Sequence, residues 1–363
     1  MYRIDEIVRY AKDNKIALQS FFHKKDMPGN MSKHIFHALV LLSIESPIEL
    51  SRFLNMPISH LEKTINKPDY KHYTVRKKRG GQRHIYAPEK QLKKIQKRLN
   101  YFLQAWYLWI KPEEVHGFVI NPHYLGRYCN IAANAAVHTG KKQVLNIDLK
   151  DFFECISAKR IKSVFTSPYF NFNEHIAIAL TLLTTYQAKL PTGAPTSPVL
   201  SNFVCLPLDA QLQTFCKENG LQYTRYADDL TFSADTDISY DTILDIILLI
   251  QKNGFSINVK KLRQQSSSRK QTVTGLTVNK KVNVDRKMLK KIRAMLHDLQ
   301  TNGLEAATRR HFKLHTTADS DLQSCFMNRL DGYINFVGQI RGKEDAFYRK
   351  YINQYESIFA KKM

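Results

Sequence analysis

Residues 221–233 read Leu-Gln-Tyr-Thr-Arg-Tyr-Ala-Asp-Asp-Leu-Thr-Phe-Ser and hold an informative pattern. Apolar and polar side chains roughly alternate on both sides of Asp228 and Asp229, a pattern that predicts two strands joined by a tight turn. Adjacent carboxylates at a hairpin tip repel each other unless a cation screens them, and hard oxygen ligands suit Mg²⁺. Aspartates are also common in turns for purely structural reasons. Residues 226–229 alone are therefore compatible with a metal site and with an ordinary turn.

A second acidic position favours the metal interpretation. The apolar run at 143–149, Gln-Val-Leu-Asn-Ile-Asp-Leu, predicts a buried strand that ends at Asp148. If this strand lies beside the hairpin, Asp148 and Asp228 can share two metal ions about 4 Å apart, the arrangement that supports in-line phosphoryl displacement. Such a transfer needs positioning and charge neutralisation and no nucleophilic side chain. Taken alone, Asp148 could equally cap a helix after the strand.

The composition indicates a polyanionic partner. The chain has 55 Lys+Arg against 32 Asp+Glu, a formal net charge of +23. A field of this sign attracts polyanions, and nucleic acid also releases counterions when its phosphates are neutralised. A merely basic protein, or one that contacts anionic lipid, is the alternative. The five cysteines form no C-x-x-C pair, which fits reduced thiols and a cytoplasmic location. The apolar stretches are too short to cross a bilayer, so no membrane partner is expected.

The pattern along the chain predicts mostly helices. Residues 1–70 indicate short helices, including a helix–turn–helix pair at 48–63 with Ser59 as a cap before its second helix. Such a pair could bind duplex DNA as a repressor does, although simple packing is the less specific explanation. Two strand-like runs around Gly80 and Gly81 predict a hairpin. Helical periodicity returns at 157–187 and from 285 onward, where the helices are basic.

Four motifs together resemble those of reverse transcriptases. Residues 226–229 (Tyr-Ala-Asp-Asp) resemble the Y-x-D-D box, and Asp148 followed by Phe152-Phe153 resembles the first palm motif. Residues 190–202 resemble the L-P-Q-G…S-P segment, and residues 254–261 resemble the G-…-N-x-x-K motif. Order and spacing match from about residue 73 to 280, which chance does not explain.

The resemblance implies an α+β fold, a right-hand polymerase whose antiparallel palm sheet is backed by helices. It divides the chain into an N-terminal helical extension (1–70), fingers (71–145), a palm (146–284, with finger elements at about 157–190) and a helical thumb (285–363). Residues 330–337, Leu-Asp-Gly-Tyr-Ile-Asn-Phe-Val, resemble a thumb helix of bacterial members.

The same resemblance implies an RNA-directed DNA polymerase that uses two Mg²⁺ ions, or Mn²⁺ in their place. Asp148, Asp228 and Asp229 are then the catalytic residues and metal ligands, together with the backbone carbonyl of Leu149. Phe153 stands at the family's steric gate, where a ring would clash with a ribose 2′-OH. Adjacent strand residues face opposite ways, so Phe152 is expected to be buried.

Nucleotide contacts are implied at five further positions. Arg83 precedes residues 84–88 as in the family's R-x-I-x-x-P pattern and is expected to clamp the triphosphate. Lys77 nearby is a further candidate, although a solvated basic turn is the preferred explanation for it. Gly193 is expected to let the backbone approach template and nucleotide closely. Lys261 is expected near the leaving pyrophosphate. Thr192 stands where the family commonly has Gln, which leaves the detail of these contacts open.

Two shorter motifs resemble those of retron enzymes. Asn134 and His138 match N-A-x-x-H before the first palm motif, and Val273 and Gly275 match V-T-G after the last. Each motif is a weak signal alone, but both stand at the places expected for a retron enzyme. Their residues are interpreted as RNA-binding family positions. The retron resemblance implies four partners: a structured noncoding RNA that is both template and primer, its branched DNA product, deoxynucleoside triphosphates, and an effector protein in antiphage defence. Another bacterial reverse transcriptase (abortive-infection, diversity-generating or group II intron type) and a catalytically vestigial RNA-binding scaffold remain the alternatives.

Overall fold

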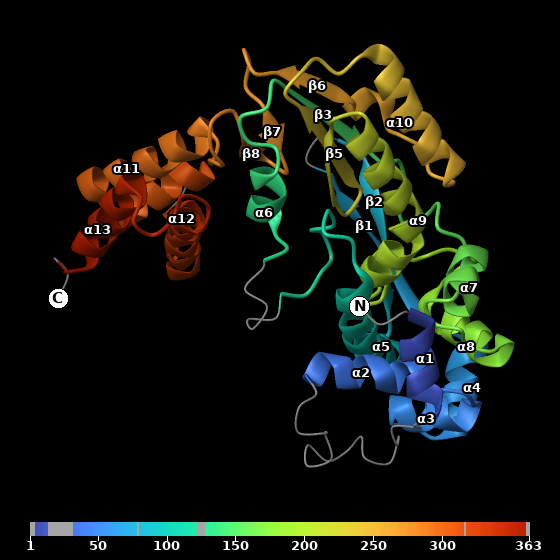
Figure 1. Cartoon of the computed structure of the whole chain (residues 1–363). Coiled ribbons are helices and arrows are strands. Elements are labelled where there is room, and N and C mark those ends of the chain that lie inside the picture. The colour runs from blue at the N-terminus through green and yellow to red at the C-terminus, as the bar shows by residue number, and fades with distance from the viewer. Residues whose placement is uncertain (1–3, 14–31, 78–79, 122–127, 316, 361–363) are drawn as a thin grey trace. The chain divides into compact units, whose positions relative to one another are not determined.

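A computed structural model of the chain describes residues 4–13, 32–77, 80–121, 128–315 and 317–360 (Figure 1). The chain divides into two units, each assembled from segments that are distant in sequence. The first unit contains Met1–Cys129, Asn146–Thr231 and Ile238–Leu262, and the second contains Asn130–Leu145, Phe232–Asp237 and Arg263–Met363.

Helices form most of the first unit. The early ones are α1 (Ile4–Asp13), α2 (Lys33–Leu42), α3 (Pro47–Leu54) and α4 (Ile58–Asn66). The later ones are α5 (Lys90–Ile110), α7 (Ala158–Thr166), α8 (Glu174–Thr184), α9 (Ser197–Glu218) and α10 (Tyr240–Lys252). Helix α5 packs against α2, α8 and α9, and it buries Leu99, Trp106 and Tyr107 almost completely. The helices expected before residue 71 are therefore confirmed where the chain is described, and residues 14–31 lie outside that description.

The predicted helix–turn–helix pair consists of α3 and α4, and its second cap is not the expected one. Ser46 caps α3 in a capping box with Glu49. Helix α4 begins directly after Pro57, whose side chain makes no capping bond, so Ser59 lies inside the first turn and the prediction of a serine cap is wrong. Because α3 packs on α5 and α8, and α4 packs on α8, the pair serves as packing within the fold.

The predicted hairpin is present. Strands β1 (Tyr70–Arg76) and β2 (Gln82–Pro88) pair antiparallel, with a register that runs from Tyr70 opposite Pro88 to Arg76 opposite Gln82. Gly80 and Gly81 at the turn have φ values of 90° and 82°, which glycine adopts without steric cost.

A four-stranded sheet carries the carboxylates predicted from the sequence. Its strands are β3 (Gln143–Asp148), β4 (Gln222–Tyr226), β5 (Asp229–Ala234) and β6 (Arg263–Ser266), in the order β4-β5-β3-β6. Val144, Leu145 and Ile147 are at most 1% exposed, as the apolar run predicted for a buried strand. Helix α9 packs against β4, so the α+β class with a sheet backed by helices is confirmed.

The second unit has its own core. Its elements are α6 (Ile131–Ala136), β7 (Thr272–Val273), β8 (Leu276–Thr277), α11 (Arg286–Phe312), α12 (Ser320–Arg341) and α13 (Ala346–Ala360). The last three helices pack on one another (Figure 1). Phe326, Leu330, Ile334 and Val337 recur at helical spacing and are at most 1% exposed, so this stripe of α12 forms the core.

Within the described residues, no helix is both long enough and apolar enough to cross a membrane.

Candidate active site

Asp148 and Asp228 meet at the ends of neighbouring strands. Asp148 is the last residue of β3, and Asp228 lies in the turn between β4 and β5. The backbone N–H of Leu149 donates to the carbonyl of Asp228 with an N···O distance of 2.9 Å. Two aspartates 80 positions apart in the sequence are thereby brought to one edge of the sheet.

The environment of Asp228 suits a cation. Burial raises the pKa of this carboxyl, and the nearby Asp148 carboxylate raises the pKa further. A hydrogen bond from its own backbone N–H and the charges of Lys261 and Arg83 act in the opposite direction. A half-buried carboxylate that faces a second carboxylate is stabilised by a hard divalent ion, and the oxygen donors of this pair fit Mg²⁺.

The third predicted ligand is placed differently from the other two. Asp229 is the first residue of β5, where successive side chains point to opposite faces, and its side chain is exposed. Among the residues that the structure describes, no three His, Cys, Asp or Glu side chains gather as a metal site. The structure therefore brings together two of the three carboxylates. The metal roles of Asp229 and of the Leu149 carbonyl stay predictions.

Lys261 forms an ion pair with Asp148. Its Nζ lies 2.7 Å from Oδ1 of Asp148, and the Asp148 side chain is 13% exposed. The short 3-10 helix Val259–Lys261 holds the lysine there, because the N–H of Asn258 donates to the Asp148 carbonyl at 2.8 Å. The ammonium thus offsets the charge of one of the two carboxylates that were predicted to bind metal. The expected contact with pyrophosphate stays a prediction.

The two adjacent phenylalanines divide as expected. Phe152 is 5% exposed, and its ring centroid lies 5.9 Å from that of Phe255. Phe153 is only partly buried, with its ring 5.9 Å from that of Phe118. Phe153 is therefore the ring that a substrate could reach, while its role as a gate stays a prediction.

Gly193 has a different neighbour from the expected one. A Cβ added there would lie 2.8 Å from Cγ2 of Ile85 and 3.2 Å from the carbonyl of Tyr86, and its φ is +115°. The N–H of Tyr86 also donates to the carbonyl of Thr192 at 2.7 Å. Within the chain, the close approach that requires glycine is therefore made by strand β2. Through this contact the β1–β2 hairpin packs on the turn that precedes α9. The expected approach of the backbone to template and nucleotide stays a prediction.

Of the two basic residues predicted to clamp the triphosphate, the structure places one near the carboxylates. Arg83 on β2 is exposed, and its charge lowers the pKa of Asp228. Lys77 is exposed at the hairpin turn, where its N–H donates to the carbonyl of Gly81. Its predicted contact with the nucleotide is untested.

The retron motif residues meet inside the second unit. Asn134, His138 and Val273 are each 0% exposed, and His138 Nδ1 lies 2.7 Å from Ser233 Oγ. These three side chains have no exposed surface, so their burial is explained by packing. Their role as RNA-binding family positions stays a prediction. Gly275 is exposed, with φ +84° in the turn between β7 and β8.

The two motifs are instead in contact with each other. The hydroxyl of Thr274 donates to the carbonyl of Ile131 at 3.1 Å, and helix α6 packs on β7 and β8. Residues from both motifs share the core of this unit, among them Ala135 and Val273. The two motifs therefore belong to segments that pack against each other.

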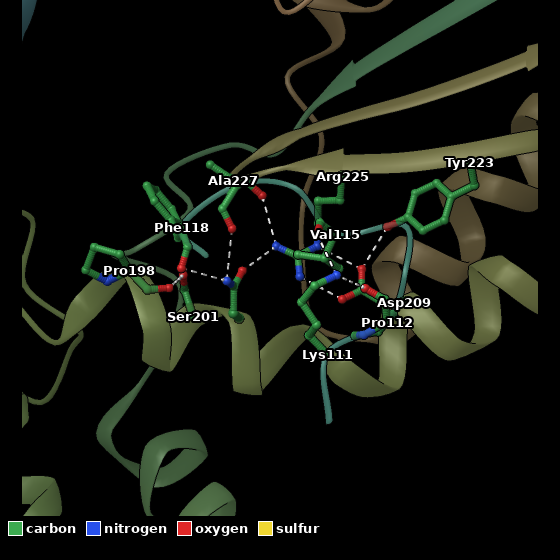
Figure 2. Close-up of polar contacts among 12 residues, drawn as sticks. Lys111, Pro112, Val115, Phe118, Pro198, Ser201, Asp209, Tyr223, Arg225 and Ala227 are labelled. Carbon is green, nitrogen blue, oxygen red and sulfur yellow. Dashed lines mark hydrogen bonds and ion pairs between the residues drawn. The ribbon is translucent and has the colours of Figure 1, made fainter. Parts of the chain in front are cut away.

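A buried polar network beside the turn between β4 and β5 was missed in the sequence (Figure 2). This turn carries Asp228, the predicted catalytic residue, and is called the catalytic turn below. Arg225 on β4 binds Asp209 on α9 through two bonds, Nε to Oδ1 at 2.8 Å and Nη2 to Oδ2 at 2.7 Å. Both side chains are 0% exposed. The available signal was Asp209 itself, an acidic residue directly after the apolar run at 203–208, because a buried charge requires a partner.

Gly117 was missed as well. A Cβ at this position would lie 2.2 Å from the backbone nitrogen of Ala227 and 2.8 Å from the carbonyl carbon of Tyr226. The backbone of the catalytic turn therefore rests directly on this glycine. A single Gly between His116 and Phe118 was the only local signal, and it does not identify what comes close.

Comparison with known proteins gives a family match. The reverse transcriptase (RNA-dependent DNA polymerase) family matches residues 75–279. The retron Mx65 reverse transcriptase of Myxococcus xanthus is 35% identical over 247 residues, which cover 63% of this chain and 55% of that protein. The retron Ec86 reverse transcriptase of Escherichia coli is 33% identical over 259 residues, which cover 69% of this chain and 77% of that protein. The chain thus spans about half the length of the first relative and over three quarters of the second.

Among solved structures, telomerase from Candida albicans in complex with a telomeric RNA fragment has a TM-score of 0.45 at 11% identity. The similarity covers 84% of this chain and 65% of the telomerase chain, and it is too distant to support a functional argument.

Proposed function

Since the chain belongs to the reverse transcriptase family and is of the retron type, we propose that it is an RNA-directed DNA polymerase that copies part of a structured noncoding RNA into single-stranded DNA. The observation that carries this proposal is the approach of Asp148 to Asp228, joined by the 2.9 Å bond from Leu149 N–H. A merely RNA-binding scaffold would have no reason to maintain two repelling carboxylates at one edge of a sheet.

The family match also gives the chain the right-hand polymerase fold class. We assign the fingers to 71–145, the palm to 146–284 with finger elements at about 157–190, and the thumb to 285–363, after an N-terminal extension at 1–70. Seating of the β1–β2 hairpin on Gly193 supports the assignment of that hairpin to the fingers.

Two Mg²⁺ ions are proposed as the cofactor, held by Asp148 and Asp228 with Asp229 and the Leu149 carbonyl as further ligands. When bound, such ions lower the charge at the attacking and leaving oxygens of a phosphoryl transfer. The chain itself contributes the fixed carboxylates, and Arg83 beside them supplies bidentate donors for a triphosphate.

Binding of Mg²⁺ can be measured without polymerisation. At ten times its Kd, Mg²⁺ should add about 1.4 kcal/mol to the free energy of unfolding and raise Tm by about 1–3 °C, because it binds only the folded pair. The rise should be smaller at acidic than at neutral pH. Burial and Asp148 raise the pKa of Asp228, so protons compete with the ion at a higher pH than for an ordinary aspartate. Differential scanning fluorimetry with Asp228→Asn as control measures both effects. An equal rise in the variant contradicts the assignment.

Sugar selection is expected to depend on Phe153. In Phe153→Ala, the preference for deoxy- over ribonucleotides, as a ratio of kcat/KM values, should fall by about 10- to 100-fold, because the 2′-OH then has room. Single-nucleotide primer extension measures this ratio. Phe152→Leu changes the buried ring beside it and should keep the wild-type ratio. Equal ratios in all three proteins would contradict the role of Phe153 as a steric gate.

The RNA partner is proposed to be both template and primer, with deoxynucleoside triphosphates as substrates, in the cytoplasm. The net charge of +23 favours such a partner through counterion release. An effector protein in antiphage defence is proposed on the retron relationship alone.

Sequencing of nucleic acid that copurifies with the protein tests the retron function. We expect a short single-stranded DNA joined to RNA. DNA copied from a variable-repeat target, or RNA with intron boundaries, would instead indicate another type of bacterial reverse transcriptase, and no copurifying DNA at all would contradict the proposal.

A further inference from the structure

The catalytic turn adopts a backbone that needs external support. Ala227, the residue before Asp228, has φ +60°, in the left-handed region that costs a residue with a Cβ free energy. Such a conformation persists where its surroundings determine it. Two contacts do so here: Gly117 lies against the Ala227 nitrogen, and Nη1 of Arg225 donates to the Ala227 carbonyl at 3.3 Å.

The same Nη1 also binds helix α9. It donates to Oδ1 of Asn202 at 2.9 Å, and the amide of Asn202 donates in turn to the carbonyl of Gly117 at 3.0 Å (Figure 2). Asn202 therefore joins the guanidinium to the glycine that supports the turn from the other side. Both supports of Ala227 are linked through this one side chain.

Asp209 orients the guanidinium. Its two oxygens bind Nε and Nη2 of Arg225, which leaves Nη1 directed at Ala227 and Asn202. At its far side, Oδ1 of Asp209 accepts a bond from the hydroxyl of Tyr223 at 2.8 Å. Every one of these side chains is at most 4% exposed.

Stability is a poor reason for such a network. Moving an ion pair out of water costs so much that apolar residues of similar volume are often equally stabilising or better. What an apolar pair cannot do is donate in a fixed direction to the Ala227 carbonyl. The bidentate geometry supplies this direction.

We propose that Arg225, Asp209 and Asn202 form a positioning device that fixes the Ala227 carbonyl and thereby the direction in which Asp228 presents its carboxylate. This inference rests on the proposed polymerase function. None of the three touches substrate. They act through the turn, where a displacement of about 1 Å can cost 10²-fold in rate.

Two matched variants test the proposal. Asn202→Ala and Tyr223→Phe each remove a hydrogen bond to the same buried pair, the first on the side of the turn and the second on the far side. Both should lower Tm. In primer extension well below Tm, Asn202→Ala should lower kcat by about 10- to 100-fold with an unchanged KM for the nucleotide. Tyr223→Phe should keep the wild-type kcat, and equal kcat values in the two variants would overturn the proposal.

The ion pair is tested by Arg225→Lys and by the double variant Arg225→Met with Asp209→Leu. Lysine keeps the charge but lacks the planar fork, so it cannot bind Asp209 through two bonds and also reach Ala227. The double variant leaves no buried charge, so it should fold with a Tm near that of the wild type. Low kcat in both supports the proposal, and wild-type kcat in the folded double variant refutes it.

The outcome for the polymerase function is separate. A wild-type protein without polymerase activity would contradict the proposed function. The proposed positioning of Asp228 would then be tested by Mg²⁺ binding. In that case the Mg²⁺-dependent rise in Tm should be lost in Asn202→Ala and kept in Tyr223→Phe, and the same rise in both would overturn the positioning.

Discussion

Asp228→Asn is expected to reduce primer extension by about 10³-fold or more, since removal of even one preorganised hydrogen-bond donor from an active site costs about 10²- to 10³-fold and a metal-binding carboxylate contributes a full charge. The amide is nearly isosteric, so the turn and its bond from Leu149 should remain. The variant should therefore fold and still bind RNA. Primer extension with Mg²⁺ and deoxynucleotides, together with an RNA-binding assay, measures the two properties separately.

Asp237→Asn is the matched control for this substitution. Asp237 follows β5, its side chain is 66% exposed, and it pairs with Lys142 at 2.7 Å. Loss of an exposed ion pair has little effect, so this variant should extend primers as the wild type does. If Asp228→Asn retained wild-type activity, the two-metal mechanism would be wrong and an RNA-binding scaffold would remain.

Gly117→Ala is expected to have the next largest effect. The added methyl would lie 2.2 Å from the Ala227 nitrogen, and the atoms it meets are backbone that cannot rotate away. Either the 114–118 segment or the catalytic turn must move. We expect a loss of about 1–3 kcal/mol in the free energy of unfolding from overpacking. We also expect a fall of about 10²-fold or more in kcat from the displaced Asp228. Chemical denaturation and primer extension measure the two.

Gly332→Ala is the control for the glycine substitution. A Cβ at Gly332 in helix α12 would meet no heavy atom within 4 Å. The change should leave activity intact and stabilise the helix by up to about 1 kcal/mol, since Ala is the better helix former. Were Gly117→Ala to behave like Gly332→Ala, the close approach to the turn would not exist in solution.

Local patterns were sufficient for the elements and for the choice of site. Alternation around Asp228, the apolar run that ends at Asp148 and the two glycines after β1 each predict their structure from neighbours a few positions away. The start of α4 is also a local feature, but the prediction of Ser59 as its cap was wrong. The helix begins directly after Pro57, so Ser59 already lies inside its first turn.

Long-range contacts decided what those residues do. A glycine indicates that something lies close but not what, so Gly193 proved to support the hairpin and Gly117 the catalytic turn. Asn134 and His138 looked like RNA contacts and are buried.

Residue patterns alone predict aspartates at strand ends, in the order that reverse transcriptases have. Folding brings Asp148 beside Asp228 and places Arg225 where it supports the turn between β4 and β5. Side-chain alternation and turn chemistry act over a few residues, whereas cross-strand hydrogen bonds need distant segments. Burial and charge pairing depend on segments that meet only when the chain has folded.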